Sequence, residues 1–417
     1  MAGHYIHPAE ENYTKAGGVK RVGLIVAVVG LVLTLLGVFL NMEYPGRIFG
    51  TLLHNSYYFL GLGLAGLFYV ASQTIGYSGW VVLVSRVSEA MARVVPIFAL
   101  IMGVVLFFGF KHIYHWAHDG IMDPTSSHYD ELIHHKEFFL NPIFFFVSTA
   151  IYLGLWSLLT WMIRKNSYAH DNEPGMARYK RAKMLCMFFL FVFAVSTSTG
   201  IWQWFMSIDP HWYSTLYGWY CFISIFVAAI ATILLITLLL KEQGFLRNIN
   251  TEHLHDLGKW TFAFSVAWAY LWFSQFMLIW YANIPEETLY FHERFEHYSF
   301  LYFFNFIINF PLPFMVLMTA RNKRNPKVLV FIASCIVIGH WLDFYLMTMP
   351  GVVKSAGIYE HGHQVMNLGF GPLEIGVPLL FAGVFIWLVF DALSKHSLVP
   401  VNHPFIQESL THSTNSI

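Results

Sequence analysis

The stretch VGLIVAVVGLVLTLLGVFLNM, residues 22–42, contains no charged side chain. A helix needs about 20 mostly apolar residues to cross the hydrocarbon core of a bilayer, so this stretch predicts a transmembrane helix. It is too long for the apolar region of a secretory signal, and no small-residue cleavage site follows it before Glu43. We therefore expect it to remain in the chain as the first membrane span.

Apolar stretches of similar length recur along the whole chain. Of its 417 residues, 57% are hydrophobic and only 12% are charged, whereas soluble domains contain roughly a quarter of charged residues. The composition therefore excludes a soluble globular protein and predicts an all-α integral membrane protein with ten transmembrane helices. The predicted spans are 22–42, 55–76, 79–110, 139–163, 184–207, 213–240, 259–282, 298–320, 328–348 and 372–393.

The charged residues also carry information about topology and partners. Lys plus Arg equals Asp plus Glu, at 24 each, so no excess of positive charge favours binding to nucleic acid. Most Lys and Arg side chains fall in the segments that lie on the same side of the membrane as the N-terminus. Because cytoplasmic loops are enriched in Lys and Arg, we expect both termini to be cytoplasmic.

The chain is expected to form one membrane domain over residues 1–417, because no long polar segment separates the spans. The sequence GIWQWFM at 200–206 resembles GHWLDFY at 339–345, and each run precedes a proline. This internal similarity predicts two four-helix bundles, over 50–207 and 213–348, and two additional helices, 21–43 and 372–393. A chance match stays open, because Trp, Phe and Met are abundant throughout. We expect the polar tail, 394–417, to be frayed and to carry no chemistry.

His340 and Asp343 lie three residues apart, on one face of the predicted ninth helix. Ionisable side chains inside a membrane span are costly, so they usually face a partner or a wet cavity. A carboxylate beside an imidazole can set the tautomer of the ring and support proton transfer. Two interpretations stay open: the pair passes protons, or it braces two helices as a satisfied buried pair.

A second charged group lies near the start of the third span, where Arg86, Glu89 and Arg93 recur at helical spacing. The group can admit protons from the cytoplasm, or it can neutralise itself and fasten the helix start. Thr199 and Tyr270 extend a polar lining along the fifth and seventh helices, and they either hold waters or bond within the helices. The proton-path hypothesis therefore comprises Arg86, Glu89, Arg93, Thr199, Tyr270, His340 and Asp343.

Metal and haem sites are not predicted. The chain has 21 histidines and three cysteines, but no spacing completes a metal site, and we expect the cysteines to be small core residues. Haem b needs two facing axial histidines in the membrane, and His340 is the only histidine deep within a span. Trp202 and Trp341 near the outer surface fit an interfacial aromatic belt, or a crevice in which a quinone ring stacks.

The turn between the fifth and sixth spans, WFMSIDPHWYSTLYG at 204–218, closely resembles the signature of the F subunit of bacterial alternative complex III. That complex is a quinol:cytochrome c, or high-potential iron–sulfur protein, oxidoreductase. The likeness extends over nearly the whole chain, in the ten-span plan, the cytoplasmic termini and the stretch GHWLD at 339–343. The F subunit is similar to the NrfD-type membrane subunits of polysulfide-reductase-like enzymes, which contain two four-helix bundles and two further helices.

The resemblance implies a role and a set of partners. The chain would lie in the bacterial inner membrane with multihaem c subunits, an iron–sulfur subunit and a homologous NrfD-like subunit that oxidises quinol. It would contribute a proton path or support, without being catalytic alone. The resemblance carries over Asp209 and His211 from the turn motif, and His340 and Asp343. Gln203 stands where relatives often have an acidic residue, which puts a relay through that position in doubt.

The resemblance implies no covalent cofactor, and the candidate ligands are quinol, such as menaquinol, and lipids. Three alternatives to a proton path stay open. The chain can bind quinone itself, in a pocket formed by His340, Asp343, Trp202 and Trp341. It can be a structural subunit on which haem subunits dock, or a stand-alone secondary transporter, which broken helices in matching positions would favour.

Overall fold

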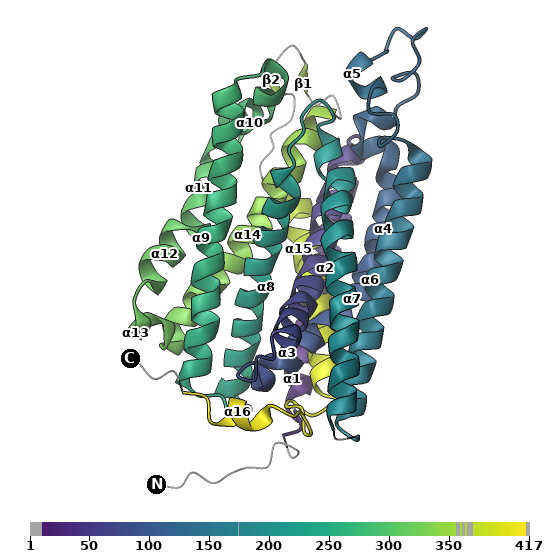
Figure 1. The fold of residues 1–417 in the computed structure, drawn as a ribbon. Helices are drawn as coiled ribbons and strands as arrows, with labels where there is room; N and C mark the ends of the chain where they lie inside the picture. The colour runs from purple at the N-terminus through teal and green to yellow at the C-terminus, as the bar shows by residue number, and fades with distance from the viewer. Residues whose placement is uncertain (1–10, 174, 356–358, 361–362, 365–369, 414–417) are drawn as a thin grey trace.

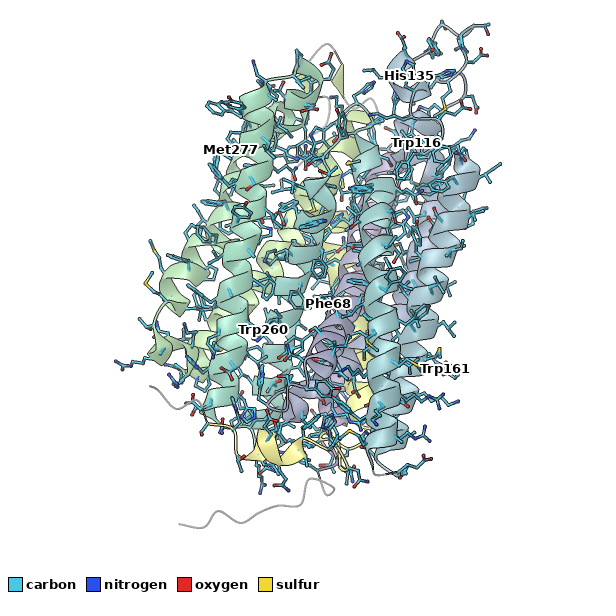
Figure 2. The ribbon with its side chains drawn as sticks, in the orientation of Figure 1. Phe68, Trp116, His135, Trp161, Trp260 and Met277 are labelled. Carbon is cyan, nitrogen blue, oxygen red and sulfur yellow. The ribbon has the colours of Figure 1, made fainter. Side chains whose placement is uncertain are left out.

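The protein is described here by a computed structural model, which covers residues 11–173, 175–355, 359–360, 363–364 and 370–413. Within these ranges, ten helices are long and apolar enough to cross a membrane, which confirms the all-α membrane fold. Trp161 and Met277 point outward from the bundle in Figure 2, as expected for side chains that face lipid. The spans are α1 (Ala16–Leu40), α2 (Pro45–Ile75), α3 with α4 (Val82–Met91 and Val95–Ile113), α6 (Pro142–His170), α7 (Met176–Trp204), α8 (Leu216–Glu242), α9 (Thr251–Ala282), α11 with α12 (Ser299–Asn309 and Pro311–Leu317), α14 (Pro326–Ser355) and α15 (Pro372–Leu393).

The spans form two four-helix bundles and one extra pair, as the sequence predicted (Figure 1). The first bundle contains α2, α4, α6 and α7, and the second contains α8, α9, α11–α12 and α14. Helix α2 packs against α8 and α14, so it joins the two bundles. At this junction Phe68 of α2 contacts Phe193 of α7 and Phe222 and Phe226 of α8 (Figure 2).

The described ends of the chain lie at one end of the bundles, the lower end in Figure 1, which we call the terminal face. The other end, the opposite face, carries the short elements α5 (Glu131–His134), α10 (Pro285–His297), β1 (Tyr359–Glu360) and β2 (His363–Gln364). The distribution of Lys and Arg predicts that the terminal face is cytoplasmic.

Helices α1 and α15 pack closely against each other through glycines. A Cβ atom at Gly30 would lie 2.1 Å from the backbone nitrogen of Leu380, and one at Gly37 would lie 2.5 Å from the Cα of Leu373. Only glycine permits this approach of two backbones, which is a common way for helices to associate in membranes. The first and the last span of the chain therefore form one unit, which meets the rest of the fold mainly where α15 contacts α2 and α3.

Two of the predicted spans are interrupted. The third span changes to a 3-10 turn at Ala92–Val94, before α4 begins with Pro96 in its first turn. The eighth span ends as α11 at Asn309, and α12 begins at Pro311, which has no N–H to continue the hydrogen-bond ladder.

The expectation of a frayed tail is wrong for residues 394–413. This segment, which includes α16 (Ile406–Leu410), crosses the terminal face beneath both bundles (Figure 1). Ser409 is fully buried and donates to the carbonyl of Trp80, 2.6 Å away, and His412 Nε2 lies 2.7 Å from Asp256 Oδ2. The tail therefore forms part of the fold, because its polar side chains replace water at the helix ends.

Candidate functional site

Asp343 lies near the middle of the second bundle, where it is 1% exposed. Its Oδ1 atom accepts hydrogen bonds from the hydroxyl of Tyr220 and from Asn305 Nδ2, the latter at 2.8 Å. Its Oδ2 atom accepts from Ser224 Oγ at 2.8 Å and from Trp268 Nε1 at 2.9 Å. The four donors come from α8, α9 and α11, so all helices of the second bundle meet at this carboxyl group.

This arrangement can hold the carboxyl group in either protonation state. An ionised carboxylate has about four lone-pair sites, and the four donors fill them, which compensates for the loss of water around a buried charge. Two of the donors, Tyr220 and Ser224, are hydroxyls that can turn and accept instead. A proton can therefore join or leave Asp343 without leaving the site unsatisfied.

His340 lies one helical turn before Asp343 and is fully buried. Its Nδ1 atom lies 3.0 Å from Ser224 Oγ, and it is 4.0 Å from Asp343 Oδ2, so Ser224 connects the two. Because the hydroxyl hydrogen of Ser224 goes to Asp343, its oxygen accepts from His340, which assigns the proton to Nδ1. Among the described residues His340 Nε2 has no hydrogen-bond partner, so its lone pair is free to take a proton.

A small cavity, with room for about one water molecule, adjoins Asp343. Its wall includes two side chains with buried polar atoms that lack a partner among the described residues, Gln275 Oε1 and Arg294 Nη2. Water needs space and two to four polar partners to occupy a buried site, and this cavity supplies both. The lining consists of Tyr220, Trp272, Gln275, Tyr290, Phe291, Arg294, Tyr302, Asn305, Asp343, Leu346 and Met347.

Arg294 closes this cavity on the side of α10, a helix that lies outside the membrane spans. It is 2% exposed, its Nε donates to the carbonyl of Leu346 at 3.1 Å, and its Cζ lies 3.3 Å from the centre of the Tyr290 ring. Burial acts to lower the pKa of Arg294, but Tyr290 and Asp209 nearby raise it by more. The cavity therefore has a permanent cation at one end and the Asp343 carboxyl group at the other.

A second cavity of about 900 Å³ lies beyond Arg294 at the opposite face. Tyr290 lines both cavities, so only a thin wall separates them. The second cavity contains the two residues of the turn motif, Asp209 and His211. His211 Nε2 lies 2.6 Å from Asp130 Oδ2. Burial acts to raise the pKa of Asp130, but hydrogen bonds from His211 and from the backbone outweigh it, so the pKa lies below its usual range.

Buried polar side chains also continue from Asp343 toward the terminal face. Asn309 Nδ2 donates to Asn305 Oδ1 at 2.7 Å, and Ser265 lies fully buried on α9. Nine residues before Ser265 on the same helix, Asp256 lies 2.5 Å from Lys259 Nζ and pairs with His412. The second bundle thus contains polar groups along most of its length.

The charged group of the third span differs from the predicted ladder. Arg86 Nη1 lies 3.1 Å from Glu89 Oε2, as expected, but the second partner of Arg86 is Asp171, with Nη2 2.6 Å from its carboxylate. Arg93 is exposed in the 3-10 turn. Glu89 also lines a small cavity of about 60 Å³ in the first bundle, together with His403 of the tail.

The other predicted residues lie away from Asp343. Thr199 donates to the hydroxyl of Tyr152, 3.1 Å away in the first bundle, and Tyr270 is 69% exposed on the outer side of α9. Trp341 donates to Asn55 of α2 at 2.8 Å and lines a different cavity, and Trp202 lies half-buried on α7. The four residues of the predicted quinone pocket are thus not brought together around one cavity.

Comparison with protein-family models and with curated protein sequences gives no match for this chain. Among the residues that the structure describes, no three His, Cys, Asp or Glu side chains form a group able to hold a metal ion. Sequence reasoning missed Tyr220, Ser224, Trp268 and Arg294, because nothing in their local pattern distinguishes them from ordinary residues of a membrane bundle.

Proposed function

We propose that this chain conducts protons through its second four-helix bundle. The observation that carries the proposal is the fully buried pair of Asp343 and His340, joined by Ser224 and adjoining a polar cavity. Ionisable side chains at this depth are costly in a membrane, and proton relays are one of the roles for which they are retained.

The geometry supports a sequence of proton positions. A proton on His340 Nε2 leaves Nδ1–H free to pass its own proton through Ser224 Oγ to Asp343 Oδ2. The protonated carboxyl group then releases the proton to water in the adjoining cavity, while the Ser224 hydroxyl turns back to donate to Asp343 Oδ2. The positive charge of Arg294 raises the energy of a hydronium ion in this cavity, so Arg294 forms an electrostatic barrier that the proton crosses on its way to Asp209.

We further propose that the chain works as a membrane subunit of an alternative complex III in a bacterial inner membrane. The resemblance of the 204–218 turn and of the 339–343 stretch supports this part of the proposal. The partners would be multihaem c subunits, an iron–sulfur subunit and a homologous ten-span subunit that oxidises quinol. Asp209 and His211 of that turn line the cavity at the opposite face, next to Arg294.

The proton path is tested with the full chain in phosphatidylcholine vesicles that contain a pH-sensitive dye. A potassium diffusion potential drives protons inward, and the rate of acidification is measured. We expect Asp343→Asn to reduce the protein-dependent rate at least tenfold, whereas Asp119→Asn, in an exposed loop, leaves it unchanged. An equal rate for Asp343→Asn and the unchanged chain would refute the path.

The complex is tested separately, by purification from native membranes in mild detergent, mass spectrometry and a haem-sensitive absorption spectrum. We expect multihaem cytochromes, an iron–sulfur protein and a homologous membrane subunit to co-purify. A lone colourless protein would overturn the assignment to a respiratory complex, and it would leave the result of the vesicle experiment unaffected.

A further inference from the structure

A long groove separates the α1–α15 pair from the second bundle. It has a volume of about 1650 Å³, including the part that opens to the side. It follows α15 from Glu374 to Phe390, which corresponds to about 24 Å of helix. Val19 and Val22 of α1 form its wall near the terminal face, and Trp341 of α14 lies in its wall toward the opposite face.

The polar groups in the wall of this groove are all engaged within the protein. The hydroxyls of Tyr58 and Thr232 donate to backbone carbonyls at 2.6 and 2.7 Å, and Trp341 Nε1 donates to Asn55. The carboxylate of Glu374 accepts from an arginine of α2 at 2.6 Å. Among the described residues, the groove therefore offers no free hydrogen-bonding group to a quinone ring, and hydrocarbon chains are the complementary occupant.

The mouth of the groove at the terminal face is positively charged. Four basic residues, Lys15, Lys20, Arg21 and Lys395, lie on the ends of α1 and α15 that form this mouth. Asp391 at the end of α15 is shared by Lys20 at 3.3 Å and Lys395 at 2.6 Å. Two further carboxylates, Glu11 and Glu242, belong to the neighbouring segments. The mouth thus carries an excess of positive charge at the depth where lipid headgroups lie, which complements an anionic phosphate.

We propose that this groove binds one anionic phospholipid, with its acyl chains along α15 and its phosphate at the basic mouth. The lipid fills the space that the α1–α15 pair leaves against α8 and α14, so it contributes to the packing of the fold. This site is separate from the proton path, because Asp343 and Arg294 line other cavities.

The acyl-chain part of the site is tested by blocking the groove. The purified full chain is exchanged into mixed micelles with dioleoyl phosphatidylglycerol or dioleoyl phosphatidylcholine, and native mass spectrometry counts the lipids retained. We expect one retained phosphatidylglycerol. Ala382→Trp fills the groove and lowers this retention at least tenfold, whereas Ala150→Trp, on the exposed side of α6, leaves it unchanged.

The headgroup part is tested by Lys20→Gln with Arg21→Gln. Each basic residue beside an anionic headgroup contributes about fivefold in affinity, so the preference of the double variant for phosphatidylglycerol over phosphatidylcholine should fall by about 30-fold. The control, Lys180→Gln with Arg181→Gln, removes two exposed charges at the start of α7 and should have no effect.

Three outcomes would overturn the proposal. The first is equal retention in the Ala382→Trp and Ala150→Trp variants, and the second is no preference for phosphatidylglycerol in the unchanged chain. The third is recovery of a quinone, rather than a phospholipid, from protein purified out of native membranes. The Lys20→Gln with Arg21→Gln variant leaves the groove packing intact, so it tests the preference for phosphatidylglycerol even if Ala382→Trp does not fold.

Discussion

Replacing Asp343 distinguishes the two interpretations of this buried group, a proton relay and a structural brace. In Asp343→Leu, Trp268 Nε1–H and the Asn305 amide lose their acceptor, and neither can turn into an acceptor through the same atom. A buried unsatisfied donor costs about 1–3 kcal/mol, and the Asn305 amide lies at the lower end because it lines the cavity, so we expect a loss of unfolding free energy of about 2–4 kcal/mol.

Asp343→Asn should cost much less. The asparagine oxygen can retain the bonds from Ser224 and Trp268, and Tyr220 can turn its hydroxyl to accept from the new amide. Only the Asn305 amide is left without its acceptor, and it lines the cavity where water can reach it. We expect a loss of about 1–2 kcal/mol, at the lower end of the range for one unsatisfied group.

Both variants are measured by unfolding in mixed micelles with increasing sodium dodecyl sulfate, alongside the vesicle acidification assay. A relay predicts that both abolish proton flux while only Asp343→Leu is strongly destabilised. A brace predicts that flux is unaffected wherever the protein stays folded. If Asp343→Leu were as stable as the unchanged chain, the four donors would not be directed at this carboxyl group, and the argument would fail.

Three further predictions concern the helix pair and the tail. Gly30→Leu should separate α1 from α15, because its Cβ would overlap the facing backbone, whereas a side chain in the control Gly154→Leu on α6 meets open space. The separation is measured by disulfide formation between cysteines introduced in α1 and α15. Unchanged disulfide formation in Gly30→Leu would contradict the prediction. Ending the chain after Leu398 opens the cavity lined by Cys186, so maleimide labelling of that buried thiol should accelerate at least tenfold; equal rates would show that the tail does not cover the cavity. Burial lowers the pKa of His403 to about 4 in the docked tail, whereas a free histidine has a pKa of about 6.5. Between about pH 6.5 and 4, His403 is therefore protonated in the undocked tail and neutral in the docked tail. Docking of the tail should therefore weaken on acidification over that window, as measured by hydrogen exchange of 397–413. His403→Phe should reduce this dependence, and His396, whose pKa burial also lowers, accounts for the remainder.

The sequence predicted the spans well because bilayer thickness constrains each span locally. The stretch of residues 22–42 lies almost entirely within α1, and the 372–393 prediction coincides with α15. The third span was predicted at 79–110 and is found at 82–113. The glycines before it indicate a turn, but they do not determine at which residue the turn ends and the helix begins. The 3-10 break at Ala92–Val94 depends on packing that no local pattern reveals.

The candidate site was only partly predictable. The spacing of His340 and Asp343 places them on one face, but the donors to Asp343 lie 123, 119, 75 and 38 residues away along the chain. Charge patterning suggested Arg93 as the second partner of Glu89, whereas Ser167 donates to Glu89 and Asp171, 85 residues beyond Arg86, pairs with Arg86. Such pairings follow from how the bundles close, which periodicity within one helix does not determine.

The pairing of the first span with the last constrains how the chain is made. About 330 residues separate the end of α1 from the start of α15. At 5–20 residues per second, α1 waits in the membrane for about 17–66 s before its glycine face meets its partner. The mean hydropathy of α1, 2.9, is high enough for this helix to stay in the bilayer before α15 is made. During synthesis, lipid or an insertion factor must cover that face, and a ribosome that stalls before residue 372 leaves it open to the glycine face of another nascent chain.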